Sequence, residues 1–252
     1  MYKMVAMLAF LVTLNYGGVS RADEIQPGAV VSVQTRGVSV PIYTVWNKDA
    51  LATVVLYSGG GGGYGKIGED GWPGSQNFLI RSAKLFAAHA FNVVLVGRAT
   101  DVSDLDGFVR TGDNHDQDNQ AILREIKLKS VAPIWLVGTS MGTISATAAA
   151  IRDDGSNIAG IVLTSSVTSY SVRGAVPAQA LDKIKVPVLL AMGEDDRRVP
   201  IDHGSKMKSA LITAGVKYEY VIYPREGHGF NKDENVFDFF KRVEKFLAEN
   251  LK

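Results

Sequence analysis

The segment Gly138-Thr139-Ser140-Met141-Gly142 has the pattern G-x-S-x-G, between an apolar run and a stretch of small residues. In such a strand–turn–helix context the serine occupies a sharp, strained turn, and the flanking glycines remove side chains where the chain reverses. A glycine-rich turn with a capping serine fits the bare pattern too. The context favours the first interpretation and predicts that Ser140 is a nucleophile.

A serine hydroxyl needs a base to react near neutral pH, and the chain offers four histidines. His89 is expected to pack within a helix, and His203 to cap a helix or lie on the surface. His228 stands in a glycine-flanked loop after the last expected strand. Because sites form at the carboxyl ends of parallel strands, we predict that His228 is the base.

The base in turn needs an acid that orients it, expected after a strand and between Ser140 and His228. Three neighbouring carboxylates, Glu194, Asp195 and Asp196, follow the apolar run 187–191. Such a cluster is usually a solvated turn, but its position at a strand end indicates a functional role. We predict Asp196 as the acid, with Asp195 in reserve.

An oxyanion formed at Ser140 would need two backbone amides, and losing one such donor costs about a hundredfold or more in rate. The amide of Met141 follows the nucleophile. The second donor is expected in the loop after residues 53–57, where Ser58 precedes five glycines. Glycine lets the backbone approach a ligand closely. We assign Gly60, with Gly59 close behind.

The same glycine loop contains two partial nucleotide-binding motifs. Residues 60–66 resemble the start of a phosphate-binding loop, and residues 63–68 fit a dinucleotide fingerprint. Both motifs require a helix to begin at once, which the stretch 69–74 does not favour. Ile67 also stands where the phosphate-binding loop needs Ser or Thr. We therefore predict no nucleotide cofactor.

An acidic cluster at 113–118 (DNHDQD) offers hard ligands at close spacing. It could bind a divalent cation, but the favoured interpretation is the acidic first turn of a helix, which the helix dipole stabilises. Asp113 or His115 could instead line the mouth of the pocket. No metal and no other cofactor are expected.

The elements that position these residues follow from hydrophobic periodicity. Apolar, β-branched runs alternate with helical patterns, which predicts an α/β fold with a parallel sheet covered on both faces and an antiparallel amino-terminal edge. The expected strands are 29–34, 38–46, 53–57, 92–96, 133–137, 158–163, 187–191 and 218–223. The expected helices are 78–90, 119–129, 141–152, 203–214 and 235–250.

Composition limits the function classes. The chain has 252 residues, 46% hydrophobic and 21% charged, enough for one sizeable core. A net charge of +1 gives no general attraction to nucleic acid, which is not an expected partner. With no cysteine, disulfides, thiolate metal sites and cysteine nucleophiles are excluded.

The amino terminus has the pattern of a secretory signal. Lys3 precedes an uncharged apolar run, residues 4–14, and small residues stand at Ser20 and Ala22. The run is too short to span a bilayer. We predict a signal peptide over 1–22 cleaved after Ala22, a single domain over 23–252 with a formal charge of −1, a periplasmic or secreted location and no membrane anchor after cleavage.

From the run TVVLY (53–57) to the last helix, the chain resembles the α/β-hydrolase superfamily. The segments MGEDDRRVP (192–200) and YPREGHGF (223–230) resemble its dienelactone hydrolase-like and prolyl-oligopeptidase-like branches. The resemblance implies an eight-stranded, mostly parallel sheet and an acyl-enzyme at Ser140. Dienelactone hydrolases use cysteine where this chain has serine. Many members carry histidine before the oxyanion glycines, where Ser58 stands here.

The expected function is a carboxylesterase-like serine hydrolase for small or soluble esters. The stretch between 158–163 and 187–191 is too short for a large lid, which predicts an open site, with Tyr64, Trp72 and Phe230 as candidate apolar walls. Two alternatives stay open. One is a serine peptidase of the same fold, and the other is a non-catalytic exported binding module.

Overall fold

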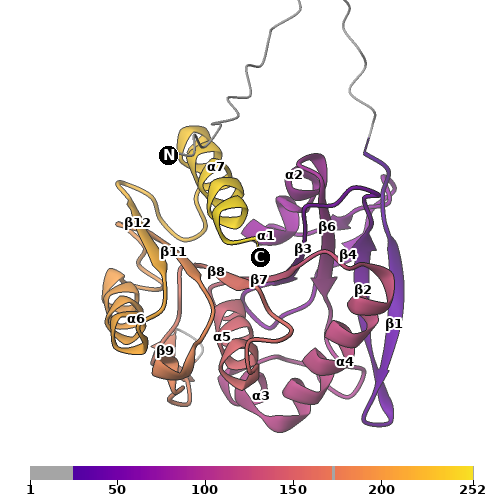
Figure 1. The fold of residues 1–252 in the computed structure, drawn as a ribbon, viewed down its shortest axis with the longest axis horizontal. Coiled ribbons are helices and arrows are strands. Elements are labelled where there is room, and N and C mark those ends of the chain that lie inside the picture. Colours follow the sequence, from indigo (N-terminus) through magenta and orange to yellow (C-terminus); the bar gives the residue numbers. More distant parts are fainter. Residues whose placement is uncertain (1–24, 172–173, 252) are drawn as a thin grey trace, which may run out of the picture.

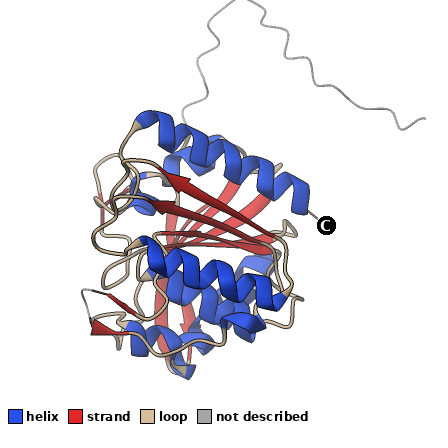
Figure 2. Cartoon of the chain, turned by 90° about the vertical axis from the view of Figure 1, so that its left-hand side faces the viewer, coloured by secondary structure: helices blue, strands red, loops and turns tan. Residues whose placement is uncertain are grey.

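The computed structural model describes residues 25–171 and 174–251 (Figure 1). The predicted signal peptide and its cleavage site after Ala22 lie outside the described residues. A twisted sheet stands between two layers of helices (Figure 2). This arrangement confirms the predicted α/β fold with a sheet covered by helices on both faces.

Within the described residues the main sheet has eight strands. Those in its centre are apolar runs buried on both faces, as parallel strands covered by helices require. The strands are β1 (Ala29–Thr35), β2 (Val38–Val45), β3 (Ala52–Tyr57), β6 (Phe91–Val96), β7 (Ile134–Thr139), β8 (Gly160–Thr164), β11 (Val188–Gly193) and β12 (Tyr218–Tyr223). Their order in space is β1-β2-β6-β3-β7-β8-β11-β12. β1 pairs antiparallel with β2, and β2 with β6, whereas the following pairs are parallel.

Helices cover both faces of the sheet (Figures 1 and 2). On one face lie α1 (Phe78–Arg81), α2 (Ala83–Ala88) and α7 (Asp233–Asn250). On the other lie α3 (Gly107–Thr111), α4 (Asp113–Lys129), α5 (Gly142–Arg152) and α6 (Ile201–Ala214). Short elements connect them: β4 (Lys66–Ile67), β5 (Pro73–Gly74), β9 (Tyr170–Ser171), β10 (Gly174–Ala175) and the 3₁₀ turn η1 (Leu181–Lys183).

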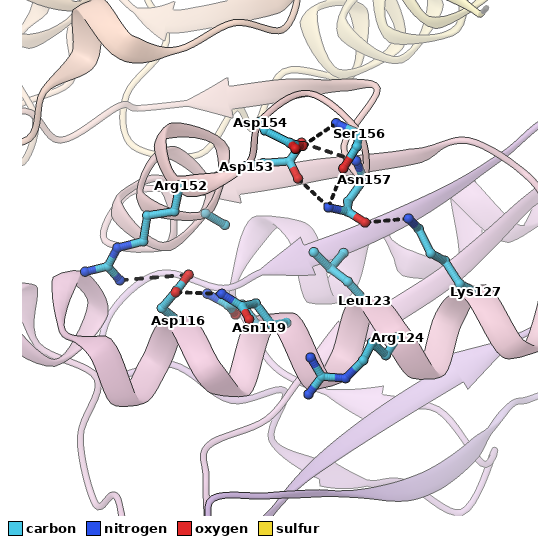
Figure 3. A pocket seen from close by; sticks show the side chains of 12 residues that line it. Asp116, Asn119, Leu123, Arg124, Lys127, Arg152, Asp153, Asp154, Ser156 and Asn157 are labelled. Atoms are coloured by element: carbon cyan, nitrogen blue, oxygen red, sulfur yellow. Dashed lines mark hydrogen bonds and ion pairs between the residues drawn. The ribbon is translucent and has the colours of Figure 1, made fainter.

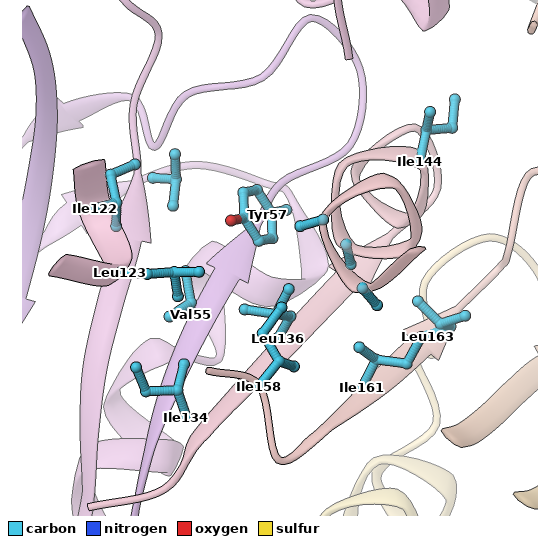
Figure 4. Close-up of a cluster of buried hydrophobic side chains, with 14 of the residues drawn as sticks. Val55, Tyr57, Ile122, Leu123, Ile134, Leu136, Ile144, Ile158, Ile161 and Leu163 are labelled. Atoms are coloured by element: carbon cyan, nitrogen blue, oxygen red, sulfur yellow. The ribbon is translucent and has the colours of Figure 1, made fainter. Parts of the chain in front are cut away.

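The sheet separates two hydrophobic clusters. One packs α4, α5 and α6 against β3, β7, β8 and β11, and its centre is shown in Figure 4. The other packs the aromatic residues of α1, α2 and α7 on the opposite face. Along α7 the apolar residues Phe239, Val243, Phe246 and Leu247 recur at helical spacing and are buried, so this face of the helix packs against the core.

The structure differs from the sequence prediction at several boundaries. The expected helix 119–129 begins at Asp113, so the acidic cluster lies inside α4. The expected helix 78–90 is divided at Ser82 into α1 and α2. The connection between β8 and β11 contains only short elements in its described part, consistent with the absence of a large lid. Within residues 25–171 and 174–251, no helix is long and apolar enough to cross a bilayer.

Candidate active site

Ser140 lies in the turn between β7 and α5 with a φ of +52°. Non-glycine residues rarely adopt this left-handed conformation, which persists where the surroundings hold it. The Ser140 amide donates to the Thr164 carbonyl (3.0 Å), and the Ser140 carbonyl accepts from the Thr143 amide (2.9 Å) and hydroxyl (2.7 Å). These bonds tie the turn to the end of β8 and to α5. The geometry is that of a nucleophile elbow.

Gly138 and Gly142, which flank the turn, lie so close to other backbone atoms that a side chain would not fit at either position. A Cβ added at Gly138 would lie 2.7 Å from the Thr143 Cα. At Gly142 it would overlap the carbonyl oxygen of Tyr57, at the end of β3. The first collision is within the turn, as the sequence pattern predicts. The second is with the neighbouring strand, so Gly142 lets α5 begin directly against the sheet.

His228 lies after β12 and is hydrogen-bonded to Asp196, which follows β11. The distance from His228 Nδ1 to Asp196 Oδ2 is 2.9 Å. The Asp196 side chain is fully buried, whereas that of His228 is 22% exposed. Asp195, the reserve acid, is exposed, and its amide donates to the Glu226 carbonyl (2.9 Å). The structure therefore brings Asp196 to the imidazole.

The Asp196 carboxylate is held as an anion. Burial works to raise its pKa, but hydrogen bonds from His228, the Val199 amide (2.9 Å) and Ser165 Oγ (2.8 Å) outweigh that cost, so the pKa lies below its ordinary value. The Arg198 amide also donates to Oδ1 (2.9 Å). An ionised carboxylate in this position fixes the imidazole ring and favours its protonated form during proton transfer.

The loop that carries His228 is fixed from both sides. Glu226, buried under the loop, accepts from the amides of Asn231 (3.0 Å) and Lys232 (2.8 Å). Arg81 donates to the Gly229 carbonyl (2.8 Å). A Cβ at Gly193 would lie 2.5 Å from the Glu226 carbonyl, so glycine at the end of β11 lets the two loops meet.

Ser140 and His228 line one open pocket of about 360 Å³. Its remaining lining residues come from the glycine loop, from α1 and the residues before it, from the end of β7, and from the loops after β11 and β12: Gly59, Gly60, Gln76, Asn77, Phe78, Arg81, Thr139, Arg198, Gly229 and Asn231. The candidate walls Tyr64, Trp72 and Phe230 pack in the core instead. Among the described lining residues, the permanently charged side chains are two arginines.

Both predicted oxyanion-binding segments lie next to Ser140. A Cβ added at Gly59 would lie 3.0 Å from the Ser140 Cβ. Gly60 lines the pocket with a φ of +58°. Met141 immediately precedes α5, so its amide belongs to the positive end of the helix. A developing negative charge at Ser140 would therefore lie close to amides from two segments.

Two histidines lie in other environments than the sequence predicted. His89, expected to be packed, ends α2 with its side chain 50% exposed, and its Nδ1 lies 3.2 Å from Glu244 on α7. His203, expected to cap or lie on the surface, is buried near the start of α6. Its Nδ1 accepts from the Thr168 amide (3.1 Å). Burial is the main cause that lowers the pKa of His203.

The acidic cluster forms the first turn of α4. Asp113 is 92% exposed and pairs with Arg152 (3.0 Å). His115 is buried, with its Nε2 2.9 Å from Ser145 Oγ, and burial followed by nearby arginines lowers its pKa to about 3. Neither side chain lines the pocket of Ser140. The part of the chain described here contains no group of three or more His, Asp or Glu suited to a metal ion.

A further cavity of about 350 Å³ lies between α4 and the loop after α5 (Figure 3). The Asp153 carboxylate closes that loop by accepting from the amides of Gly155 (3.0 Å) and Ile158 (3.2 Å). Lys127 donates to Asn157 (2.5 Å). The loop leads to the amino-terminal end of β8, whereas Ser140 follows the carboxyl-terminal end of β7, so this cavity is separate from the pocket of Ser140.

Sequence reasoning missed Ser165, which donates to Asp196, and the buried Arg110, which donates to the Gly60 carbonyl (3.2 Å). Ser165 directly follows β8, a strand-end position that could have suggested it. Arg110 lies in the short helix α3, where nothing in the local sequence distinguishes it.

Comparison with known proteins supports this picture. The profile of the prolyl oligopeptidase family matches residues 164–252. The chain is 36% identical over 75 residues to dipeptidyl aminopeptidase BIII of Pseudoxanthomonas mexicana, and 32% identical over 75 residues to the acylamino-acid-releasing enzyme of Homo sapiens. Each match covers 30% of this chain, but only 11% of the first protein and 10% of the second. The chain therefore spans a small part of the relatives it matches.

Solved structures resemble nearly the whole described domain. The acylaminoacyl peptidase of Pyrococcus horikoshii aligns with a TM-score of 0.71 at 16% identity, over 91% of this chain and 42% of that one. A dienelactone hydrolase from Anabaena variabilis aligns with a TM-score of 0.67 at 16% identity, over 90% and 100%. At this identity the likeness concerns the fold. The chain thus has the α/β-hydrolase fold, a hydrogen-bonded His228–Asp196 pair beside Ser140, and a carboxyl-terminal region similar to the prolyl oligopeptidase family.

Proposed function

We propose that the chain acts as a serine hydrolase through an acyl-enzyme on Ser140. The observation that carries the proposal is the His228–Asp196 hydrogen bond beside a strained Ser140 in the same pocket. His228 removes the Ser140 proton as the hydroxyl oxygen attacks the substrate carbonyl, and then gives that proton to the leaving group. Amides at Met141 and Gly60 bind the oxyanion. Water, activated by His228, then releases the acyl group.

We further propose short, amino-terminally blocked peptides as the preferred substrates. The family match and the relatives named as peptidases favour an amide bond. Arg81 and Arg198 are the permanently charged side chains among the described lining residues, so a free substrate ammonium would meet like charge there. A neutral acylated amino terminus or an anionic group avoids this repulsion.

Hydrolysis of small esters is the second candidate, and the open pocket and short β8–β11 connection favour it. The same acyl-enzyme mechanism cleaves both ester and amide bonds. A non-catalytic binding module fits less well, because binding alone gives no chemical reason to keep Ser140, Asp196 and His228 together.

The test compares N-acetyl-alanyl p-nitroanilide, alanyl p-nitroanilide and p-nitrophenyl acetate with wild type and Ser140→Ala. We expect the acetylated anilide to be cleaved with higher kcat/KM than the free amine. Ser140→Ala should lower every rate by about a thousandfold or more. Turnover of the ester without either anilide would favour the esterase. Equal rates in wild type and Ser140→Ala would overturn the hydrolase assignment.

We also propose that the protein is exported, on the basis of the charged start, apolar run and small residues over 1–22. Expression of the full chain in a bacterium, followed by amino-terminal sequencing of the periplasmic fraction, should give a chain that starts at Asp23. A chain that keeps Met1 and stays with the membrane would contradict cleavage after Ala22.

A further inference from the structure

Arg110 of α3 is buried below the glycine loop, with 1% of its surface exposed. Its Nη2 donates to the carbonyls of Ser58 and Gly60, each at 3.2 Å. Its Nε donates to the Leu105 carbonyl (2.8 Å), and its Nη1 to Ser145 Oγ (2.7 Å). Burying a guanidinium is costly unless its donors are used. These four bonds use donors on all three guanidinium nitrogens.

The two bonds to the loop orient the peptide units around Gly60. In a trans peptide the C=O and the following N–H point in opposite directions. The carbonyls of Ser58 and Gly60 belong to the units immediately before and after the one that carries the Gly60 amide. That central unit is held by a bond from the Gly62 amide to the Gly59 carbonyl (3.2 Å). Arg110 thus bonds to the two peptide units on either side of the unit that carries the predicted oxyanion donor, the Gly60 amide.

The bond to Ser145 connects the same guanidinium to α5, the helix that Met141 precedes. Arginine only donates, so Ser145 Oγ accepts from it, and the same oxygen lies 2.9 Å from His115 Nε2. Because the pKa of His115 is lowered to about 3, its ring is neutral near pH 7 and places no second positive charge beside the guanidinium. One buried cation therefore contacts the loop of one predicted oxyanion donor and the helix next to the other.

We propose that Arg110 is a positioning residue that fixes the relative positions of the two oxyanion-binding amides, those of Gly60 and Met141. Carbonyls that accept from a cation also polarise their peptide units, which strengthens hydrogen bonding nearby. The guanidinium fork serves several acceptors in fixed directions, whereas the ammonium of lysine cannot. This inference rests on the proposed function, since it concerns how the oxyanion of that reaction is bound.

The test uses Arg110→Met and Arg110→Lys, with Arg152→Met as the matched control. Arg152 joins α5 to the carboxyl end of α3 by donating to the carbonyls of Thr111 (2.9 Å) and Gly112 (3.2 Å), and none of these bonds involves the glycine loop. Both Arg110 variants should lower kcat by about a hundredfold, the order of an oxyanion donor, and leave KM within about twofold. Arg152→Met should leave kcat and KM near their wild-type values.

A second readout separates positioning from loss of folded protein. A peptidyl trifluoromethyl ketone forms a hemiketal oxyanion on the serine, so its Ki should rise by the same factor as kcat falls. A ground-state competitor, the N-acetylated product, should keep its Ki. An Arg110 variant that keeps kcat, or loses kcat without any change in the ketone Ki, would overturn the proposal.

Ser145→Ala keeps the guanidinium but removes its bond to α5, and it serves if both Arg110 variants fail to fold. It should raise the ketone Ki and lower kcat by the same factor, and an unchanged Ki would contradict the proposal. Failure of the proposed function is recognised separately, because wild type would then neither turn over substrate nor bind the ketone.

Discussion

Ser165 and Ser166 are neighbouring buried serines after β8 with different surroundings. Ser165 Oγ donates to Asp196 Oδ2, the oxygen that also accepts from His228. Ser166 Oγ has no hydrogen-bond partner within the described residues. The two positions therefore form a natural pair for testing how the acid is held.

Ser165→Ala should lower kcat by several-fold and the free energy of unfolding by about 1 kcal/mol, because the Asp196 carboxylate loses one fixed donor. Ser166→Ala should change neither quantity appreciably. Steady-state kinetics and urea unfolding of the two variants provide the measurement. Equal effects of the two substitutions on kcat would show that the Ser165 bond plays no part in orienting Asp196.

Residues with a local sequence signal could be predicted, and those acting through distant contacts could not. Ser140 lies in a glycine-flanked turn whose pattern is visible in five residues, and His228 follows a recognisable strand. Ser165 meets Asp196 across 31 positions, and Arg110 meets Gly60 across 50. Such contacts depend on which loops the sheet brings together, so the local sequence does not contain them.

At the scale of elements, α4 and α5 meet through a buried neutral histidine. His115 has a pKa lowered to about 3 in the folded protein, against 6.5 for the free side chain. Between these values the unfolded chain binds a proton that the folded chain does not, so stability rises with pH across this window. Stability therefore falls as the pH is lowered from about 6.5.

The free energy of unfolding of His115→Gln should depend less steeply on pH, because one titrating group is removed. The slope should fall by about 1.4 kcal/mol for each pH unit within the window. Urea unfolding from pH 7 to pH 4.5 would measure the slope. His89→Gln is the control for the same substitution at a histidine that is half exposed instead of buried. A His115→Gln protein with the wild-type slope would contradict a buried neutral imidazole.

Long periodic elements were predicted from the sequence, whereas short ones were not. The helices α5, α6 and α7 lie where the hydrophobic spacing places them. The five residues of α3 are too few to display a helical period, and its start depends on Asp106, whose side chain accepts from the Val109 amide (2.8 Å). The helix α3 carries Arg110. The contact to the glycine loop therefore comes from a helix that could not be predicted from the sequence.

At the scale of the whole molecule, the strand order brings the site together. Turns and loops after β7, β8, β11 and β12 supply Ser140, Ser165, Asp196 and His228, and these four strands are consecutive in the sheet. The alternation of strands and helices predicted a parallel sheet. It does not predict that β6 lies between β2 and β3 in the sheet, although β6 follows β3 in the chain. The resemblance to α/β-hydrolases implied the eight-stranded sheet.

The most direct test of the central claim is covalent labelling of the folded protein with a fluorophosphonate, located by peptide mass spectrometry. Wild type should carry one adduct, on the peptide that contains Ser140, and Ser140→Ala should carry none. His228→Ala should react far more slowly, because the serine then has no base. Absence of labelling in folded wild-type protein, or an adduct on another residue, would contradict a catalytic Ser140.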